Sequence, residues 1–166
     1  MSLRISKNQI ERFSRQIVLK NIGILGQKKI IQAKVLIVGM GGLGCPVAEF
    51  LARAGVGCLG IIDFDKVALS NIHRQCLYDY PDIGKFKVQT AKKKIIRINT
   101  KIKIDTYNLR LNEKNITKII KKYDFIVDGS DNFKTKFLLN DFCIKNKKIL
   151  VTGAISKFDG HLFTFN

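Results

Sequence analysis

Several patterns that would indicate other kinds of protein are absent from this sequence of 166 residues. Its four cysteines form no C-x-x-C pair, which argues against a zinc site or a disulfide framework within the chain. No uncharged apolar run approaches the roughly 18 residues that a membrane span needs. The opening segment, MSLRISKNQIERFSRQ, is polar and holds no apolar stretch of the signal-peptide type. We therefore expect a soluble, cytoplasmic protein with no membrane contact and no zinc.

Acidic residues are also scarce, with 13 against 30 basic residues and a formal net charge of +17. Such a charge is common in nucleic-acid-binding proteins. Here, however, only seven of the basic residues are arginine, and the lysines are spread along the whole chain. The abundance of Lys, Ile and Asn is typical of an AT-rich coding sequence, as in an organelle or endosymbiont, whose soluble compartment would then replace the cytoplasm. We expect no nucleic-acid partner.

The hydrophobic pattern alternates between strands and helices from residue 34 onward. Short β-branched runs bounded by glycine or polar residues predict strands, and apolar residues at helical spacing predict helices. The predicted strands are 34–39, 58–65, 101–107, 124–130, 148–153 and 160–166, and the predicted helices between them are 43–55, 85–99, 112–123 and 132–146. The first 30 residues look helical, with a capping box at Ser6 and Gln9. This order predicts one α/β domain over residues 1–166, with a Rossmann-like, mainly parallel sheet, helices on both faces and a helical N-terminal extension.

A glycine-rich loop follows the first predicted strand. The segment GMGGLG at 39–44 matches G-x-G-x-x-G between a strand and a helix. Gly39 would make the tight turn, Gly41 would admit a phosphate, and Gly44 would let helix and strand pack closely. Asp63 ends the second predicted strand, where a carboxylate typically accepts hydrogen bonds from ribose hydroxyls. Because a helix N-terminus also favours an anion, the segment predicts nucleotide binding.

The loops that follow decide which nucleotide is favoured. The segment LSNIHRQ supplies Asn71 and Arg74 just past the ribose position, and arginine suits bidentate phosphate contacts. Lys87 opens the next predicted helix, and Asp131 follows the fourth strand, where a carboxylate facing a triphosphate is a natural Mg²⁺ ligand. Cations and one acid around a phosphate tail fit ATP better than NAD. The glycine loop and its ribose carboxylate alone would also suit an NAD-dependent oxidoreductase.

Five motifs resemble, in order and spacing, those of the ThiF and MoeB family, the bacterial relatives of the ubiquitin-activating enzymes. They are RFSRQIVL, GMGGLG, DFDKVALSNIHRQ, IGKFKV and DGSDNF. The resemblance extends from about Arg12 to Phe165, nearly the whole chain. It implies an adenylyltransferase that uses ATP and Mg²⁺ to activate the C-terminal glycine carboxylate of a ubiquitin-like sulfur-carrier protein. The carrier could be of the thiamine or of the molybdopterin type.

The resemblance also implies roles for individual residues. Asp63 would hold the ribose, Asp131 would bind Mg²⁺, and Arg15 would reach across a homodimer into the partner's site as an arginine finger. The catalytic set would be Arg15, Arg74, Lys87 and Asp131. The nucleotide contacts would be Gly39, Gly41, Gly42, Gly44, Asp63, Asp65, Ser70, Asn71, Arg74, Lys87, Asp131 and Asn132.

Three polar residues near these motifs have less defined roles. Asp65 could contact the ligand or only orient its loop. Asp128 could bind Mg²⁺ or hold the end of its strand. His73 is expected to face solvent rather than to take part in catalysis.

The sequence departs from the family pattern at its end. Family members continue with two C-x-x-C pairs that hold a structural zinc and with the groove that receives the carrier's tail. This sequence stops at GHLFTFN, so we expect the nucleotide half without the zinc and carrier-docking part. The final strand would then expose Leu162, Phe163 and Phe165. An impaired adenylyltransferase, or a non-catalytic module that still binds ATP or dimerises, would also fit.

Overall fold

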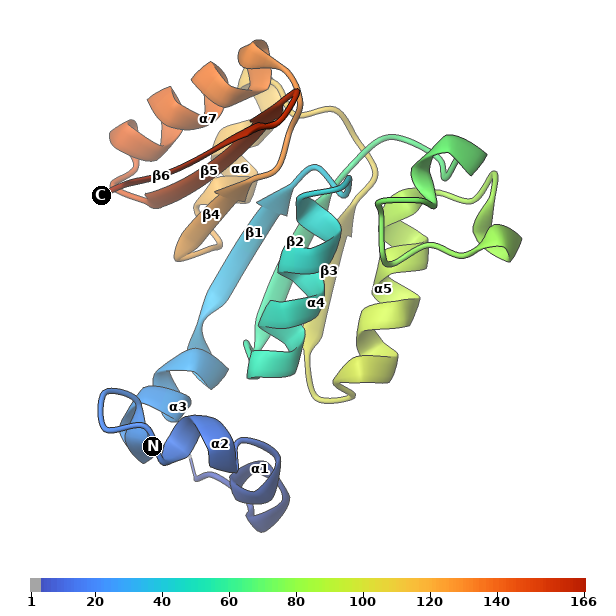
Figure 1. Ribbon diagram of the computed structural model, residues 1–166. Coiled ribbons are helices and arrows are strands. Elements are labelled where there is room, and N and C mark those ends of the chain that lie inside the picture. Colours follow the sequence, from blue (N-terminus) through green and yellow to red (C-terminus); the bar gives the residue numbers. More distant parts are fainter. Residues whose placement is uncertain (1–3) are drawn as a thin grey trace.

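A six-stranded sheet forms the centre of the computed structural model, which describes residues 4–166 (Figure 1). Its strands are β1 (Lys34–Val38), β2 (Cys58–Ile62), β3 (Lys103–Tyr107), β4 (Phe125–Asp128), β5 (Ile149–Ser156) and β6 (Asp159–Phe165). They lie in the order β3-β2-β1-β4-β5-β6, with β1 to β5 parallel and β6 antiparallel to β5. The order changes direction between β1 and β4. Ligands of open α/β sheets bind at the carboxyl ends of the strands at such a point.

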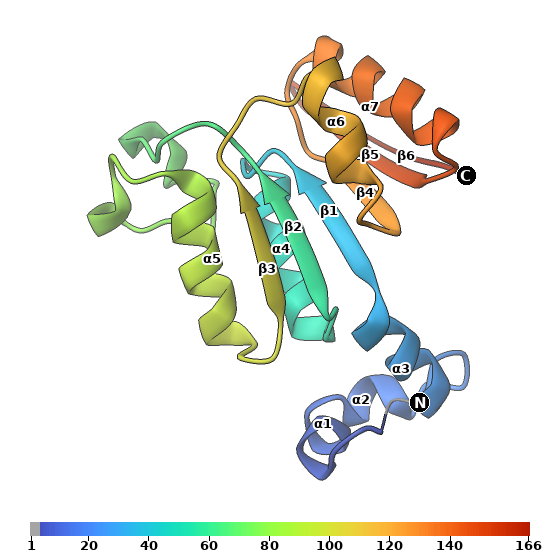
Figure 2. The ribbon, with the colours of Figure 1, turned by 180° about the vertical axis from the view of Figure 1, so that it is seen from behind.

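Helices cover both faces of the sheet (Figures 1 and 2). They are α4 (Gly44–Ala54), α5 (Lys87–Ile98), α6 (Glu113–Ile120) and α7 (Phe133–Lys145). Successive residues of a strand point to opposite faces. Val35 and Ile37 of β1 therefore join the core that contains α4 and α5, whereas Leu36 and Val38 join the core that contains α6 and α7.

Three short helices precede the sheet: α1 (Lys7–Arg12), α2 (Ser14–Ile17) and α3 (Gly23–Gln32). The predicted capping box is present, with Ser6 and Gln9 exchanging hydrogen bonds at the start of α1. The side chains of Gln16 and Gln27 both donate to the carbonyl oxygen of Ala54, at 3.1 and 3.0 Å. These bonds fasten the N-terminal helices to the C-terminal end of α4, at the end of the sheet where the parallel strands begin (Figure 1).

The structure confirms the predicted α/β fold, the mainly parallel sheet and the N-terminal helices. The predicted strand bounds were wrong by one to three residues, and the largest differences are at the ends of β2 and β5. β2 ends at Ile62, one residue before Asp63, because Asp63 turns its carboxylate back to bond the backbone of the neighbouring loops. β5 continues to Ser156, past the predicted end at residue 153, because β6 pairs with it as far as Asp159.

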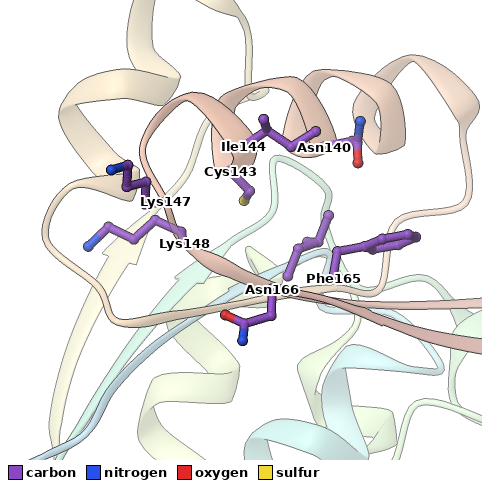
Figure 3. Close-up of a pocket in the computed structure, with 8 residues that line it drawn as sticks. Asn140, Cys143, Ile144, Lys147, Lys148, Phe165 and Asn166 are labelled. Atoms are coloured by element: carbon purple, nitrogen blue, oxygen red, sulfur yellow. The ribbon is translucent and has the colours of Figure 1, made fainter.

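The last hairpin, β5 with β6, is the least covered part of the sheet. All seven residues of β6 are exposed. A cavity of about 370 Å³ lies between α7 and this hairpin, with Cys143, Leu150 and Phe165 among its lining residues (Figure 3). No helix between residues 4 and 166 is both long and apolar enough to cross a membrane.

Candidate nucleotide-binding site

In the glycine loop that follows β1, the lack of a side chain matters for a different steric reason at each of the three motif glycines. Gly39 has φ +89°, a left-handed conformation that favours glycine, and an added Cβ would lie 2.9 Å from the carbonyl oxygen of Gly129. At Gly44 an added Cβ would lie 1.8 Å from the carbonyl oxygen of Gly39. At Gly41 the nearest atom would be 3.8 Å away, on the amide of Gln75. The backbone at Gly41 is therefore open to a ligand, and the N-terminus of α4 lies beside it.

Asp63 lies against this loop and is held there by two backbone groups. Its Oδ2 accepts a 2.8 Å hydrogen bond from the N–H of Met40, and its Oδ1 accepts a 2.8 Å bond from the N–H of Asp65. The carbonyl oxygen of Met40 in turn accepts a bond from the hydroxyl of Tyr78 at 2.9 Å. Each carboxylate oxygen can accept a further hydrogen bond. The predicted ribose carboxylate is thus fixed next to the glycine loop in an orientation that still offers acceptors.

Lys87 is a buried cation, with only 7% of its side chain exposed, at the first residue of α5. Its ammonium lies 3.1 Å from Oδ2 of Asp65, and its N–H donates to the carbonyl oxygen of Asp65 at 3.0 Å. Asp65 is half exposed. This pairing favours the interpretation in which Asp65 orients Lys87 and its loop. Contact of either residue with a ligand stays a prediction.

Arg74 follows the short 3₁₀ turn at Leu69–Asn71 and lies beside the glycine loop. Its Cγ and Cδ would be 3.7 Å from a Cβ placed on Gly42. Its Nη1 donates to the carbonyl oxygen of Ser70 at 2.7 Å and is 2.9 Å from Nε2 of His73. The Oδ1 of Asn71 accepts the N–H of Ala68 at 3.0 Å, which stabilises the turn. The structure therefore places Ser70, Asn71 and Arg74 together, beside Gly42.

The turn after β4 holds the last group of predicted residues. Asp131 is exposed and lies just before α7, whose N-cap is Asn132, with Oδ1 accepting the N–H of Thr135 at 2.9 Å. This turn packs on the glycine loop, because a Cβ on Gly129 would lie 3.1 Å from the backbone nitrogen of Gly44. Asp131 thus belongs to the same edge of the sheet as the glycine loop.

The carboxylate of Asp128 is fully hydrogen-bonded by other groups of the protein. Its Oδ1 accepts the N–H and the hydroxyl of Ser130, at 2.9 and 2.6 Å. Its Oδ2 accepts the ammonium of Lys136 at 2.9 Å and the hydroxyl of Thr152 at 2.7 Å. With four hydrogen bonds on two oxygens and 1% exposure, the carboxylate has no acceptor left for a metal ion. Of the two interpretations of Asp128, the structure supports the one in which it holds the strand end.

Arg15 lies apart from all of these residues. It belongs to α2, which packs beyond the amino ends of the strands, whereas the glycine loop lies at their carboxyl ends (Figure 1). Arg15 therefore does not contact the site of its own chain. An action across a dimer stays a prediction.

Two residues of the site were missed by the sequence analysis. Lys136 donates to Asp128, to Thr152 and, at 2.8 Å, to the carbonyl oxygen of Gly153, so it ties the ends of β4 and β5 together behind the turn that carries Asp131. Gln75 is 3% exposed beneath Gly41, and its Oε1 is buried without a hydrogen-bond partner. In the sequence, only the position of Gln75 within LSNIHRQ indicated a role at the site. Its burial could not be predicted, because it depends on the fold.

The chemistry of the site is that of anion binding rather than of nucleophilic catalysis. Arg74 and the N-terminus of α4 supply positive charge beside the open backbone of Gly41 and Gly42, and Lys87, paired with Asp65, adds a buried cation at the start of α5. The nearby thiol of Cys45 is buried, and burial raises its pKa to about 12, so it stays protonated at neutral pH and is a poor nucleophile. The Oε1 of Gln75 is a buried acceptor that no hydrogen bond from residues 4–166 satisfies.

The fold and these loops define a nucleotide-binding protein of the Rossmann-like α/β class. More narrowly, the chain belongs to the ThiF family, whose model matches residues 13–166. This confirms the family resemblance of the sequence motifs.

Among curated proteins, the chain is 44% identical over 163 residues to the adenylyltransferase and sulfurtransferase MOCS3 of Culex quinquefasciatus. The match covers 98% of this chain and 37% of that protein. It is 41% identical over 164 residues to the sulfur carrier protein adenylyltransferase of Thermus thermophilus, covering 99% of this chain and 60% of that protein. The chain thus spans from about a third to three fifths of the length of these relatives.

Solved structures of similar fold include Escherichia coli tRNA N6-threonylcarbamoyladenosine dehydratase, TcdA, in complex with ATP. The TM-score is 0.84 at 28% identity, over 90% of this chain and 61% of that chain. E. coli MccB with MccA-N7isoASN gives a TM-score of 0.86 at 25% identity, over 97% of this chain and 48% of that chain. Both of these curated relatives are thus named adenylyltransferases, and a protein of similar fold has been observed with ATP.

Proposed function

We propose that this chain is an ATP-dependent adenylyltransferase that activates the C-terminal glycine carboxylate of a ubiquitin-like sulfur-carrier protein. The observation that carries the proposal is the open glycine loop with Arg74 beside Gly42, together with the fixed carboxylate of Asp63 after β2 and the exposed Asp131 after β4. Curated relatives at 41% and 44% identity are named adenylyltransferases, one of them for a sulfur carrier.

In the proposed reaction, a carboxylate oxygen of the carrier attacks the α-phosphorus of ATP. The new bond joins that oxygen to the α-phosphorus, the bond to the bridging oxygen of the β-phosphate breaks, and pyrophosphate leaves. No general base is required, because a terminal carboxylate is already ionised at neutral pH. Lys87 and Arg74 would stabilise the negative charge on the transferring and leaving phosphates.

Asp131 is the proposed ligand of Mg²⁺, which would neutralise charge on the phosphate tail. Within residues 4–166 no three His, Cys, Asp or Glu side chains cluster as a ready-made metal site. A single carboxylate with phosphates and waters is an arrangement that Mg²⁺ commonly accepts in nucleotide enzymes. Asp63 would bind the ribose, and Gln75 would offer its buried amide beside the phosphates.

An NAD-dependent oxidoreductase is less well supported. The glycine loop and Asp63 would serve NAD equally well, but Arg74 over Gly42 and Lys87 at the start of α5 add cations that a dinucleotide does not need. The similar fold of TcdA is observed with ATP. Because the chain covers only part of its relatives, a module that binds ATP without catalysis is the second candidate.

Carrier-dependent exchange of labelled pyrophosphate into ATP tests the proposal. We expect exchange with a ubiquitin-like carrier of either the thiamine or the molybdopterin type and none with the same carrier lacking its terminal glycine. ATP binding without exchange for either carrier type would support the non-catalytic module. Exchange that is unchanged by Lys87→Met would contradict the role given to Lys87.

A mixing experiment tests the proposed arginine finger. Homodimers of Arg15→Ala and of Asp131→Ala should both be inactive in exchange, since each lacks a group that every site needs. After subunit exchange, a heterodimer would hold one site with both residues, so mixing should restore up to about a quarter of wild-type activity. Verified subunit exchange without recovery would show that Arg15 does not act in trans.

A further inference from the structure

The β3 edge of the sheet has backbone groups that face away from β2, at the buried Ile104 and the half-buried Thr106. β3 is the terminal strand of the order, and within residues 4–166 it pairs only with β2. The N–H of Lys103 donates to Gly57 at 2.9 Å, and the carbonyl oxygen of Tyr107 accepts from Asp63 at 3.3 Å. Because the direction of these groups alternates along a parallel strand, Ile104 and Thr106 turn their N–H and C=O groups outward.

A groove of about 540 Å³ runs along this edge and is bounded by both faces of the sheet. Lys92 approaches from α5, on one face. Lys122, which follows α6, approaches from the other, where its ammonium lies 5.7 Å from the centre of the Tyr107 ring. The complete lining consists of Lys92, Lys103, Ile104, Asp105, Thr106, Tyr107 and Lys122.

The groove carries a net positive charge, since three of its lining residues are lysines and one is acidic. That acid, Asp105, is already engaged by the protein. Its Oδ2 accepts the hydroxyl of Tyr123 at 3.2 Å, and its Oδ1 lies 3.5 Å from the ammonium of Lys103. An incoming group therefore meets Lys92 on one face and Lys122 on the other, neither of them in an ion pair with residues 4–166, beside the outward backbone groups of Ile104 and Thr106.

We propose that the β3 edge is a docking site for an extended acidic peptide segment of another protein, which adds to the sheet as a further strand. Strand addition uses the outward groups of Ile104 and Thr106, and lysines on both faces pair with acidic side chains that alternate along the added strand. A second copy of this chain is disfavoured, because each copy has a formal net charge of +17 and would bring further lysines to this edge. A nucleic acid would satisfy the lysines but would set its phosphates against the outward carbonyl oxygens.

The test uses the full chain and a synthetic peptide of about eight residues with alternating glutamate and valine and blocked ends. Binding is followed by amide chemical shifts and by hydrogen exchange of Ile104 and Thr106. We expect slower exchange at these two amides and an affinity that falls as salt rises. Thr106→Pro removes one outward N–H without breaking a bond to β2, so it should weaken binding roughly tenfold. Thr106→Val, which keeps the N–H, should not.

Lys92→Glu with Lys122→Glu gives a second variant that leaves the strand backbone unchanged, and it should also weaken binding. Mg²⁺-dependent ATP binding should be the same in all variants, since none of these residues belongs to the nucleotide site. Three results would overturn the proposal. The first is the absence of peptide binding at about 1 mM, and the second is equal peptide binding by Thr106→Pro and the wild type. The third is a single-stranded oligonucleotide that binds the same residues more tightly than the peptide.

Discussion

At the centre of the sheet four of the five residues of β1 are buried, whereas all seven residues of β6 are exposed. The contrast extends to the glycines of the two regions. An added Cβ at Gly44 would lie 1.8 Å from a backbone oxygen, but one at Gly160 in β6 would meet nothing within 4 Å. The β1 region is therefore closely fitted, whereas the side chains of β6 are largely exposed, with Phe165 lining the cavity beside α7.

This difference separates the residues around β1, which shape the proposed nucleotide site, from the residues of β6, which do not. Leu162 and Phe163 are 75% and 54% exposed, so their apolar surface adds little to the core. By contrast, Met40 and Asp63 interlock the glycine loop with the end of β2. We infer that substitutions near β1 disturb both stability and binding, whereas substitutions in β6 disturb neither.

The largest difference is expected between Gly44→Ala and Gly160→Ala. The added methyl group at Gly44 must displace the backbone of Gly39, which should cost about 3 kcal/mol or more in the free energy of unfolding and abolish ATP binding. The same change at Gly160 should stay within about 0.5 kcal/mol. Urea unfolding of both variants provides the measurement. Similar losses for the two would remove the distinction between the regions.

Asp128 and Asp131 allow the same comparison within the site, because one is buried and the other is exposed. Asp128→Asn leaves Lys136 without its carboxylate partner and should destabilise the fold by about 3 kcal/mol. Asp131→Asn changes an exposed side chain, so unfolding should shift by no more than about 0.5 kcal/mol, while the Mg²⁺ dependence of ATP binding should be lost. Thermal unfolding and calorimetry with and without Mg²⁺ distinguish the two. A stable Asp128→Asn variant would contradict the role of the Lys136 network.

The sequence predicted those features that depend on neighbours along the chain. β-branched runs located β1 and β2, and the spacing of Gly39, Gly41 and Gly44 predicted a loop whose steric demands the structure shows. The Asp65–Lys87 pair and the burial of Gln75 could not be predicted, because they depend on how distant loops fold against one another.

The turn after β4 shows the same limit. Asp128 and Thr152 are partners in the β4–β5 register, and only that register brings both to Lys136. A lysine in a helical stretch of the sequence gives no indication that its ammonium will bridge two strands. The residues proposed to bind the nucleotide lie in local sequence motifs, whereas the residues that position them depend on the fold.

A smaller effect is expected for the exposed apolar residues of β6. The double variant Leu162→Thr, Phe163→Thr should change the free energy of unfolding by less than about 1 kcal/mol and should reduce self-association, since it removes an exposed apolar patch. Leu150→Thr is the matched control, because Leu150 is 2% exposed and its loss from the core should cost about 2 kcal/mol or more. Light scattering over a range of concentrations measures association. A double variant as destabilised as the control would show that β6 contributes to the core.

The central claim, that the loops around β1 and β4 bind ATP with Mg²⁺, is tested most directly by calorimetric titration of the chain with ATP and with NADH. With Mg²⁺ present, ATP should bind at least about tenfold more tightly than NADH, and removal of Mg²⁺ should weaken only the binding of ATP. Binding of NADH as tight as that of ATP, or affinity for ATP that is independent of Mg²⁺, would contradict the account.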